Sequence, residues 1–440
     1  MARASAYRVA AMLLMSGCGD EPATDVDGFS QAELAKLKML SPLPSPRADP
    51  TNRVADDPQA AALGQRLFFD KRFSGAIKIA DDGTNGGLGA VGDTGKVACA
   101  SCHVPDSWFQ DSRSRPNALS IAIGRTSRNT PPAVNAAYYD WQQGGGAADS
   151  VWLGPLGPAE FFLGSTRLKI AHVIYDRHKA PYEAVFGPLA SALEATATDA
   201  ARFPASGKPK SVATDPDGPW EAMTADDQQA VNTIFSDFGK AIEAYERLLT
   251  SGDAPFDRYV AGDLAAIDAS AKRGLKLFIG KAACVACHAG PSFTDQKFHD
   301  LGVPQTGDNV PAADAGRFDA VPRVLANIFN TSGPFSDDTT TGKLTGLAQA
   351  DGQKGQFRTK QLRQIAETGP YMHTGQLATL ADVVAFYDKG GETTGFAGAK
   401  DPLMVPLNLS AAEQADLVAF LQTLTGAPVP AALRADTSGQ

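Results

Sequence analysis

Two short stretches of this 440-residue chain place a histidine directly after a Cys-x-x-Cys pair. The residues are Cys99, Cys102 and His103 in the first stretch, and Cys284, Cys287 and His288 in the second. This spacing is the attachment pattern of c-type haem, in which two sulfurs bond the vinyl groups and the histidine binds the iron. The sequence therefore predicts two covalent c-type haems.

Zinc binding and dithiol redox chemistry are the two alternatives for paired cysteines. A Cys₄ zinc site more usually has its pairs about 15–20 residues apart, whereas these pairs lie in different halves of the chain. A thioredoxin-like site does not require a histidine after each second cysteine. Both alternatives fit less well than haem.

The fifth cysteine, Cys18, ends a stretch that is typical of an export signal. Arg3 and Arg8 precede a short apolar run over 9–15, which is too short to span a bilayer. The letters "MSGC" resemble a bacterial lipobox, so Cys18 is a candidate lipid-anchor site; an ordinary secretory signal is the alternative. We expect a periplasmic protein that touches a membrane only through this anchor.

The composition is that of a soluble, globular chain, with 43% hydrophobic and 20% charged residues. Its length corresponds to two or three domains of about 150 residues each. The net charge of −9 argues against nucleic acid as a partner, because a nucleic-acid-binding surface is basic.

Helical periodicity dominates, and strand-like alternation is scarce, so we expect a mostly α fold with two cytochrome c-like haem domains and long loops. "GQRLFF" before the first haem motif and "GLKLFI" before the second suggest a duplicated unit. The segment 224–249 has the pattern of a long helix that bridges the domains. The predicted organisation is a signal peptide and lipobox over 1–18, a tether over 19–54, an N-terminal haem domain over 55–223, a C-terminal haem domain over 224–425 and a tail over 426–440.

Tyr387 lies on a predicted helix close to the C-terminal end of the chain. Thr379 and Asp382 form a capping box that starts this helix, and Gly390 helps to end it. Tyr387 falls on the apolar face. The pattern alone favours a core tyrosine with a hydrogen-bonded hydroxyl over a metal ligand.

Several longer stretches resemble the bacterial dihaem cytochrome c peroxidase and MauG superfamily, from about residue 55 to 425. They include "LGQRLFFDKRFSG", "SRNTPPAVNAAYYDW", "CVACHAGPSFTDQKFHDLGV" and "TGPYMHTGQLATLADVVAFYDKGG". The resemblance implies a peroxide-reactive haem in the N-terminal domain and an electron-transfer haem in the C-terminal domain.

The resemblance also bears on the iron ligands. The peroxidase branch supplies a methionine to the second haem at the position of Tyr387, whereas the MauG branch has tyrosine there. Tyr387 is thus implied as the second haem's distal ligand, with Met372, His373 and Met404 as the other candidates.

The peroxidase branch places a distal histidine in the loop after the first haem motif, and this loop has no histidine. The resemblance therefore implies an open first haem, with Glu160 as its acid/base residue. It also implies that Trp141 lies between the haems as an electron relay.

Two further assignments come from the resemblance and from side-chain chemistry. The family holds a calcium ion between its haems, and Asn129, Thr368 and Pro370 occupy the matching positions. Asparagine and backbone carbonyl oxygens are ligands that calcium prefers.

Arg363 is a candidate partner of a haem propionate, since arginine pairs well with carboxylates.

The resemblance implies a MauG-like oxidoreductase that forms a high-valent dihaem state with hydrogen peroxide and oxidises a Trp or Tyr of a partner protein. Residues 41–70 are similar to the methanobactin-associated (MbnH-like) branch, which oxidises a tryptophan of a copper-binding partner. The first alternative is a dihaem peroxidase supplied with electrons by a small cytochrome. The second is a non-catalytic electron-transfer cytochrome with two six-coordinate haems.

Overall fold

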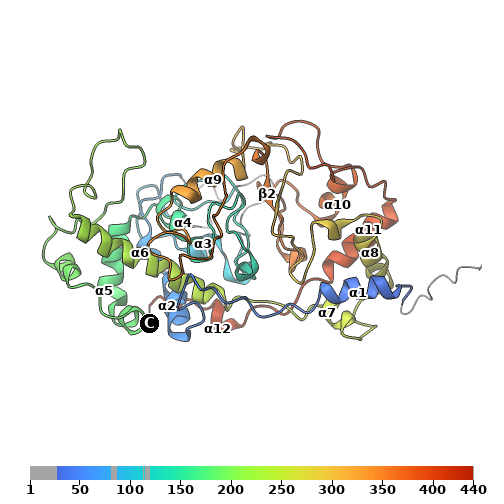
Figure 1. Ribbon diagram of the computed structural model, residues 1–440, viewed down its shortest axis with the longest axis horizontal. Helices are drawn as coiled ribbons and strands as arrows, with labels where there is room; N and C mark the ends of the chain where they lie inside the picture. The colour runs from blue at the N-terminus through green and yellow to red at the C-terminus, as the bar shows by residue number, and fades with distance from the viewer. Residues whose placement is uncertain (1–26, 81–86, 112, 114–118, 440) are drawn as a thin grey trace, which may run out of the picture.

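A computed structural model describes residues 27–80, 87–111, 113 and 119–439. The chain forms two mostly helical lobes, with a smaller set of elements between them (Figure 1). The predicted signal peptide and Cys18 lie outside the described residues. In the described part of the chain, no helix is long and apolar enough to cross a membrane.

The first lobe is built on two long helices that pack against each other. They are α2 (Pro58–Phe69), capped by Asp57, and α6 (Ala225–Glu246), capped by Thr224. Around them lie α3 (Cys99–Cys102), α4 (Leu156–Phe161) and α5 (Arg167–Phe186). Phe68, Trp152, Phe238 and Tyr245 are among the large side chains buried in this core.

The second lobe repeats this plan with different helices. Its central pair is α8 (Ala269–Ile279) and α11 (Ala411–Gln422), and α7 (Pro255–Val260) and α10 (Leu380–Asp388) pack beside them. The two "Gly-x-x-Leu-Phe" stretches fall on α2 and α8, so they occupy equivalent places in the two lobes.

One glycine lets each central helix pair approach closely. A Cβ atom at Gly64 would lie 1.9 Å from the carbonyl oxygen of Ala241, and one at Gly274 would lie 1.9 Å from that of Asp416. Backbone therefore packs against backbone at both crossings. This explains why each repeat has glycine four residues before its phenylalanine.

A two-stranded antiparallel sheet lies between the lobes, whereas α9 (Arg317–Ala326) lies over the first lobe, to whose core Val324 belongs (Figure 1). The strands are β1 (Phe298–His299) and β2 (Phe357–Arg358), and they pair Phe298 with Arg358 and His299 with Phe357.

Short 3₁₀ helices occur along the connecting segments of the described chain. They are η1 (Lys71–Phe73), η2 (Pro105–Ser107), η3 (Ala136–Tyr138), η4 (Ser191–Ala197), η5 (Cys284–Ala286), η6 (Asp351–Gln353) and η7 (Ile365–Glu367).

The predicted tether is wrong over the described part of 19–54. Residues 31–39 form α1 (Gln31–Met39), which has a capping box at Ser30. Leu37 and Leu40 are buried in the core of the second lobe. Apolar side chains spaced along a polar stretch were enough to form a packed helix.

The predicted tail over 426–440 is also wrong. It contains α12 (Ala431–Arg434), which lies against the first lobe (Figure 1). Gln65 donates hydrogen bonds to the carbonyls of Ala432 and Ala435, and Tyr245 donates one to Leu433. Residues 29–40 thus pack on the second lobe, and residues 431–435 pack on the first.

The boundary between the domains also differs from the prediction. The helix α6 does not begin the second domain, because its apolar face fills the core of the first lobe up to Leu249. The second lobe begins only after this residue. Periodicity identified the helix but could not show which core it faces.

We expect Gly64→Ala to destabilise the first lobe by about 1–3 kcal/mol, the usual cost of overpacking a core. The added methyl would collide with the backbone of Ala241, which cannot rotate away. Chemical denaturation of the holoprotein would measure the change. Gly157→Ala is the matched helical control, because its nearest neighbour would lie 3.9 Å away. Equal stability of the two variants would contradict the prediction.

Candidate haem sites and the residues between them

The two histidines of the haem motifs are held in the same way. Nδ1 of His103 lies 3.0 Å from the carbonyl oxygen of Phe109, and Nδ1 of His288 lies 3.0 Å from that of Phe293. A carbonyl can only accept, so Nδ1 carries the proton and Nε2 keeps a lone pair for a metal. Burial lowers the pKa of both histidines and so favours this neutral form.

None of the four motif cysteines forms a disulfide bond, so all four sulfurs are available for thioether bonds. Cys102 is buried, and the other three are partly buried. Desolvation raises the pKa of the Cys99, Cys102 and Cys284 thiols to about 12, which lowers their reactivity toward solvent oxidants.

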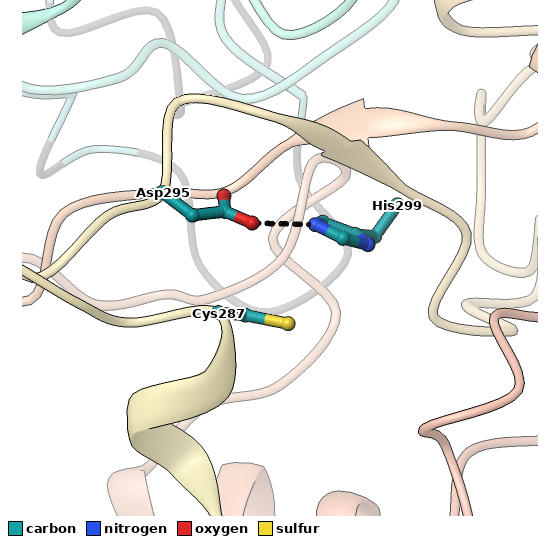
Figure 2. A group of neighbouring side chains, drawn as sticks. All are labelled: Cys287, Asp295 and His299. Carbon is teal, nitrogen blue, oxygen red and sulfur yellow. Dashed lines mark hydrogen bonds and ion pairs between the residues drawn. The ribbon is translucent and has the colours of Figure 1, made fainter.

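Cys287 also belongs to a group of potential metal ligands with Asp295 and His299 (Figure 2). His299 binds Asp401 through Nδ1 at 2.7 Å and Asp295 through Nε2 at 2.9 Å. The pKa of His299 rises to about 10, through its contact with Cys287 first and then through the two aspartates. A sulfur in a thioether is no longer a thiolate ligand, so haem attachment and metal binding exclude each other here.

A cavity of about 550 Å³ adjoins His288 and its two cysteines. Tyr387 reaches it from α10, and Met372, His373 and Met404 also line it. Burial raises the pKa of Tyr387, and the nearby Cys284 and Cys287 raise it further. All four predicted ligand candidates therefore border the same space.

His373 is held by contacts of its own. Its ring stacks on Phe357 with the centroids 4.0 Å apart, and its Nε2 contacts the side-chain amide of Gln305. Burial lowers its pKa to about 4. These contacts favour a packing role for His373, and the choice of Tyr387 as the ligand stays a prediction.

Basic side chains line the same cavity. Lys360 and Arg358 are among them, and burial lowers the pKa of Arg358 to about 10 and that of Lys360 well below its usual range. Buried cations of this kind call for anionic partners. A haem carries two propionates, so the cavity, the cysteines and the histidine fit this cofactor.

Arg363 also lines this cavity, but its guanidinium already has a protein partner. It donates to both oxygens of Asp257, at 2.8 and 3.0 Å, and to the carbonyls of Pro291 and Leu40. Its side chain is fully buried. Arg363 therefore joins α7 and the N-terminal segment, and its pairing with a propionate stays a prediction.

Glu160 lies on α4, which packs against α6 as α10 packs against α11. Glu160 and Tyr387 thus come from corresponding helices of the two lobes. The Glu160 carboxylate accepts a 3.1 Å hydrogen bond from Arg167, which in turn donates to Asn232. An acid/base role of Glu160 would therefore be carried out by a carboxylate that is hydrogen-bonded to Arg167.

Trp141 lies where the two lobes meet. It packs against the core of the first lobe, and its carbonyl accepts a hydrogen bond from Arg358, which lines the cavity of the second. Its ring contacts Phe298 edge to face, with the centroids 6.3 Å apart. Trp141 thus has contacts toward both haem motifs, and its role as an electron relay stays a prediction.

The three predicted calcium ligands are also close together. The Asn129 amide lies 3.3 Å from the carbonyl oxygen of Pro370, and Thr368 borders the same cavity. In this orientation Nδ2 faces the carbonyl, and rotating the amide would present Oδ1 instead. The oxygen-rich donor set fits calcium.

Two other findings could not be read from the sequence. His178 has an exposed-looking neighbourhood in the sequence, yet it is buried and hydrogen-bonded to Asp70 at 2.8 Å. Arg317, Arg358 and Lys360 carry no motif, and only their burial beside the predicted sites identifies them.

Comparisons with known proteins agree with this architecture. Residues 58–265 match the di-haem cytochrome c peroxidase family. The chain is 33% identical to cytochrome-c peroxidase IdrP1 of Denitromonas iodatirespirans, over 89% of this chain and 87% of that protein. It is 31% identical to the methylamine utilization protein MauG of Methylorubrum extorquens, over 92% of this chain and 89% of that protein.

The chain belongs to the di-haem cytochrome c peroxidase and MauG family. Its fold is also similar to the crystal structure of a MauG-like protein associated with microbial copper homeostasis, with a TM-score of 0.58 and 26% identity. That likeness covers 90% of this chain and 97% of the other. The protein is therefore a haem-dependent oxidoreductase with two c-type haems.

We expect Arg363→Met to destabilise the second lobe by about 3–5 kcal/mol, because it leaves the buried Asp257 carboxylate without its cation. The haem content and spectrum of the folded fraction should stay unchanged. Denaturant titration and haem absorbance would test the two parts separately. A changed haem spectrum with unchanged stability would support the propionate role instead.

Proposed function

We propose that this protein is a MauG-like oxidase, which reacts with hydrogen peroxide and oxidises a Trp or Tyr side chain of a partner protein. The single observation that carries the proposal is a tyrosine, Tyr387, at the cavity beside the second haem motif. An anionic oxygen ligand would stabilise a highly oxidised iron better than a thioether does.

When bound, the two haems supply peroxide reduction and the storage of two oxidising equivalents. His103 and His288 would hold the irons through Nε2, and Tyr387 would complete the second site. Glu160, oriented by Arg167, would move a proton between the peroxide oxygens as their bond breaks. Trp141 would carry electrons between the sites.

A copper-associated partner is the narrower form of this proposal. Its support is the likeness to the MauG-like protein associated with microbial copper homeostasis, together with the similarity of residues 41–70 to that branch. We place the protein in the periplasm, where covalent haem is attached. The anchor at Cys18 remains part of the proposal.

A cytochrome c peroxidase that receives electrons from a small cytochrome is the second candidate function. The observation in its favour is the 33% identity to cytochrome-c peroxidase IdrP1. It would use the same open first haem, but it needs no partner side chain as a substrate.

We expect Tyr387→Phe to abolish the low-spin ferric signal of the second haem, because the phenyl ring has no oxygen to bind the iron. The wild-type ferric protein should show one high-spin and one low-spin haem by electron paramagnetic resonance. Peroxide should then produce a near-infrared charge-resonance band in the wild type and not in the variant.

Tyr371→Phe is the matched control, since Tyr371 borders the same cavity but donates its hydroxyl hydrogen bond to Ile365. It should leave both signals intact. Two low-spin haems in the wild-type protein would refute the open first site. An unchanged low-spin signal in Tyr387→Phe would refute the tyrosine ligand.

Removal of calcium should test the site at Asn129. We expect a chelator to lower the melting temperature and calcium, but not magnesium, to restore it, because the carbonyl and amide oxygens suit the larger ion. Differential scanning calorimetry would measure the shift. Asn129→Ala should remove the response to calcium, and a response that persists in this variant would exclude Asn129 as a ligand.

A further inference from the structure

The ring of Trp141 lies against a buried arginine. The guanidinium carbon of Arg317 is 4.1 Å from the centre of the Trp141 ring and 4.2 Å from that of Phe298. Arg317 therefore lies between Trp141, which packs on the first lobe, and Phe298 of β1, in the sheet between the lobes.

Glycines provide the space for this arrangement. A Cβ atom at Gly146 would lie 2.4 Å from Nη1 of Arg317 and 2.5 Å from Phe298, and one at Gly145 would lie 2.7 Å from the carbonyl oxygen of Gly316. Gly146 also has a positive φ of 73°. The "GGG" stretch after Trp141 thus lets the first residue of α9 reach the indole ring.

Among the residues that the structure describes, no carboxylate forms an ion pair with Arg317. Its described hydrogen bonds run from Nη1 to the carbonyls of Gly145 and Gly146, at 3.3 and 2.8 Å. Burial alone lowers its pKa to about 10, with no contribution from a carboxylate, and it remains charged at neutral pH. Only 5% of its surface is exposed, so water screens it little.

Other basic groups add to this charge. The Lys343 ammonium lies 5.2 Å from the centre of the Trp141 ring and donates to the carbonyls of Asp140 and Asp149. Arg358 donates to the carbonyl of Trp141. Asp140 and Asp149 contribute opposite charge near Lys343, and the side chain of Asp149 is bound to Thr331. Arg317 is the cation that touches the ring face.

A cation over an aromatic face is attracted to the electrons of the neutral ring. Removing one electron from the ring turns this attraction into repulsion between two positive charges, and the low dielectric of a buried site strengthens the repulsion. Arg317 therefore disfavours the oxidised form of Trp141.

We propose that Arg317 is a positioning residue that keeps Trp141 in its closed-shell state, so that Trp141 conducts electrons between the haem sites without itself retaining the oxidation. The inference rests on the relay role of Trp141 in the proposed function. It explains how a readily oxidised side chain can lie on the electron path of a peroxide-driven enzyme and survive.

The electron balance is simple. Hydrogen peroxide accepts two electrons and two protons to form two molecules of water. The electrons leave the two haem sites, and one of them crosses from the second site to the first through Trp141. Trp141 has the same number of electrons before and after the crossing, and the partner protein later returns two electrons.

The test compares Arg317→Gln, Arg317→Lys and wild-type holoprotein after addition of hydrogen peroxide. We expect the Gln variant to give on the order of tenfold more tryptophan radical by electron paramagnetic resonance, since it removes a desolvated cation from the ring face. Its near-infrared band should decay faster by a similar factor. Arg317→Lys should largely restore wild-type behaviour because it keeps the charge.

Two control variants test whether the extra radical signal of Arg317→Gln lies on Trp141 and whether it is specific to Arg317. Arg317→Gln combined with Trp141→Phe should lose the extra radical signal, which places the radical on Trp141. Arg53→Gln removes a cation from a different ring, that of Phe186, and should leave the yield unchanged. If Arg317→Gln fails to fold with both haems, Lys343→Gln takes its place and should raise the radical yield to a smaller extent.

An unchanged radical yield in folded Arg317→Gln, or in Lys343→Gln where that variant is needed, would overturn the inference. A yield that rises equally in Arg317→Lys and Arg317→Gln would also overturn it, because packing rather than charge would then be responsible. If the wild type shows no near-infrared band but Arg317→Gln still raises the yield on Trp141, the inference stands and the charge-sharing part of the proposed function fails.

Discussion

The close contact of two helix backbones at a glycine is the constraint from which both haem sites follow. In each lobe the helix before the haem motif crosses a later helix, at Gly64 on Ala241 and at Gly274 on Asp416. In the second lobe the motif follows this helix closely, from Ile279 to Cys284, and in the first lobe α3 packs against α2. His103 and His288 make the same contact with a backbone carbonyl, which indicates that the haem-binding segment was duplicated as a unit. The residues expected on the opposite side of each iron, Glu160 and Tyr387, differ.

The ends of the chain make the two lobes depend on each other. The N-terminal segment buries Leu37 in the second lobe, and the C-terminal segment brings Leu433 to Tyr245 of the first. Electron transfer between the two haem sites requires that their separation stays constant. A side chain such as Trp141 conducts only while it keeps its contacts with both lobes. The crossed segments contribute to that constancy by tying each lobe to residues from the other end of the described chain.

The sequence predicted the local features well because they depend on short-range chemistry. The helix type of α6, the capping box at Thr379 and the attachment residues are all set by neighbouring residues. The place of α1, the partner of Arg363 and the burial of Arg317 depend on contacts between distant segments. An amphipathic pattern shows that a face is buried, but it does not show what covers that face.

The buried charges of the interior also explain why the fold would be more stable with its haem bound. The chain has a net charge of −9, yet the region between the lobes and around the second cavity holds the buried Arg317 and Arg358 and the partly buried Lys360. Burying such cations without partners destabilises a fold. The propionates of a bound haem would offset this cost beside Arg358 and Lys360. They would not reach the ring face of Trp141 in the same way, because Arg317 is enclosed by two aromatic rings and glycine carbonyls. Its charge therefore acts on the Trp141 and Phe298 rings, of which the indole is the more easily oxidised.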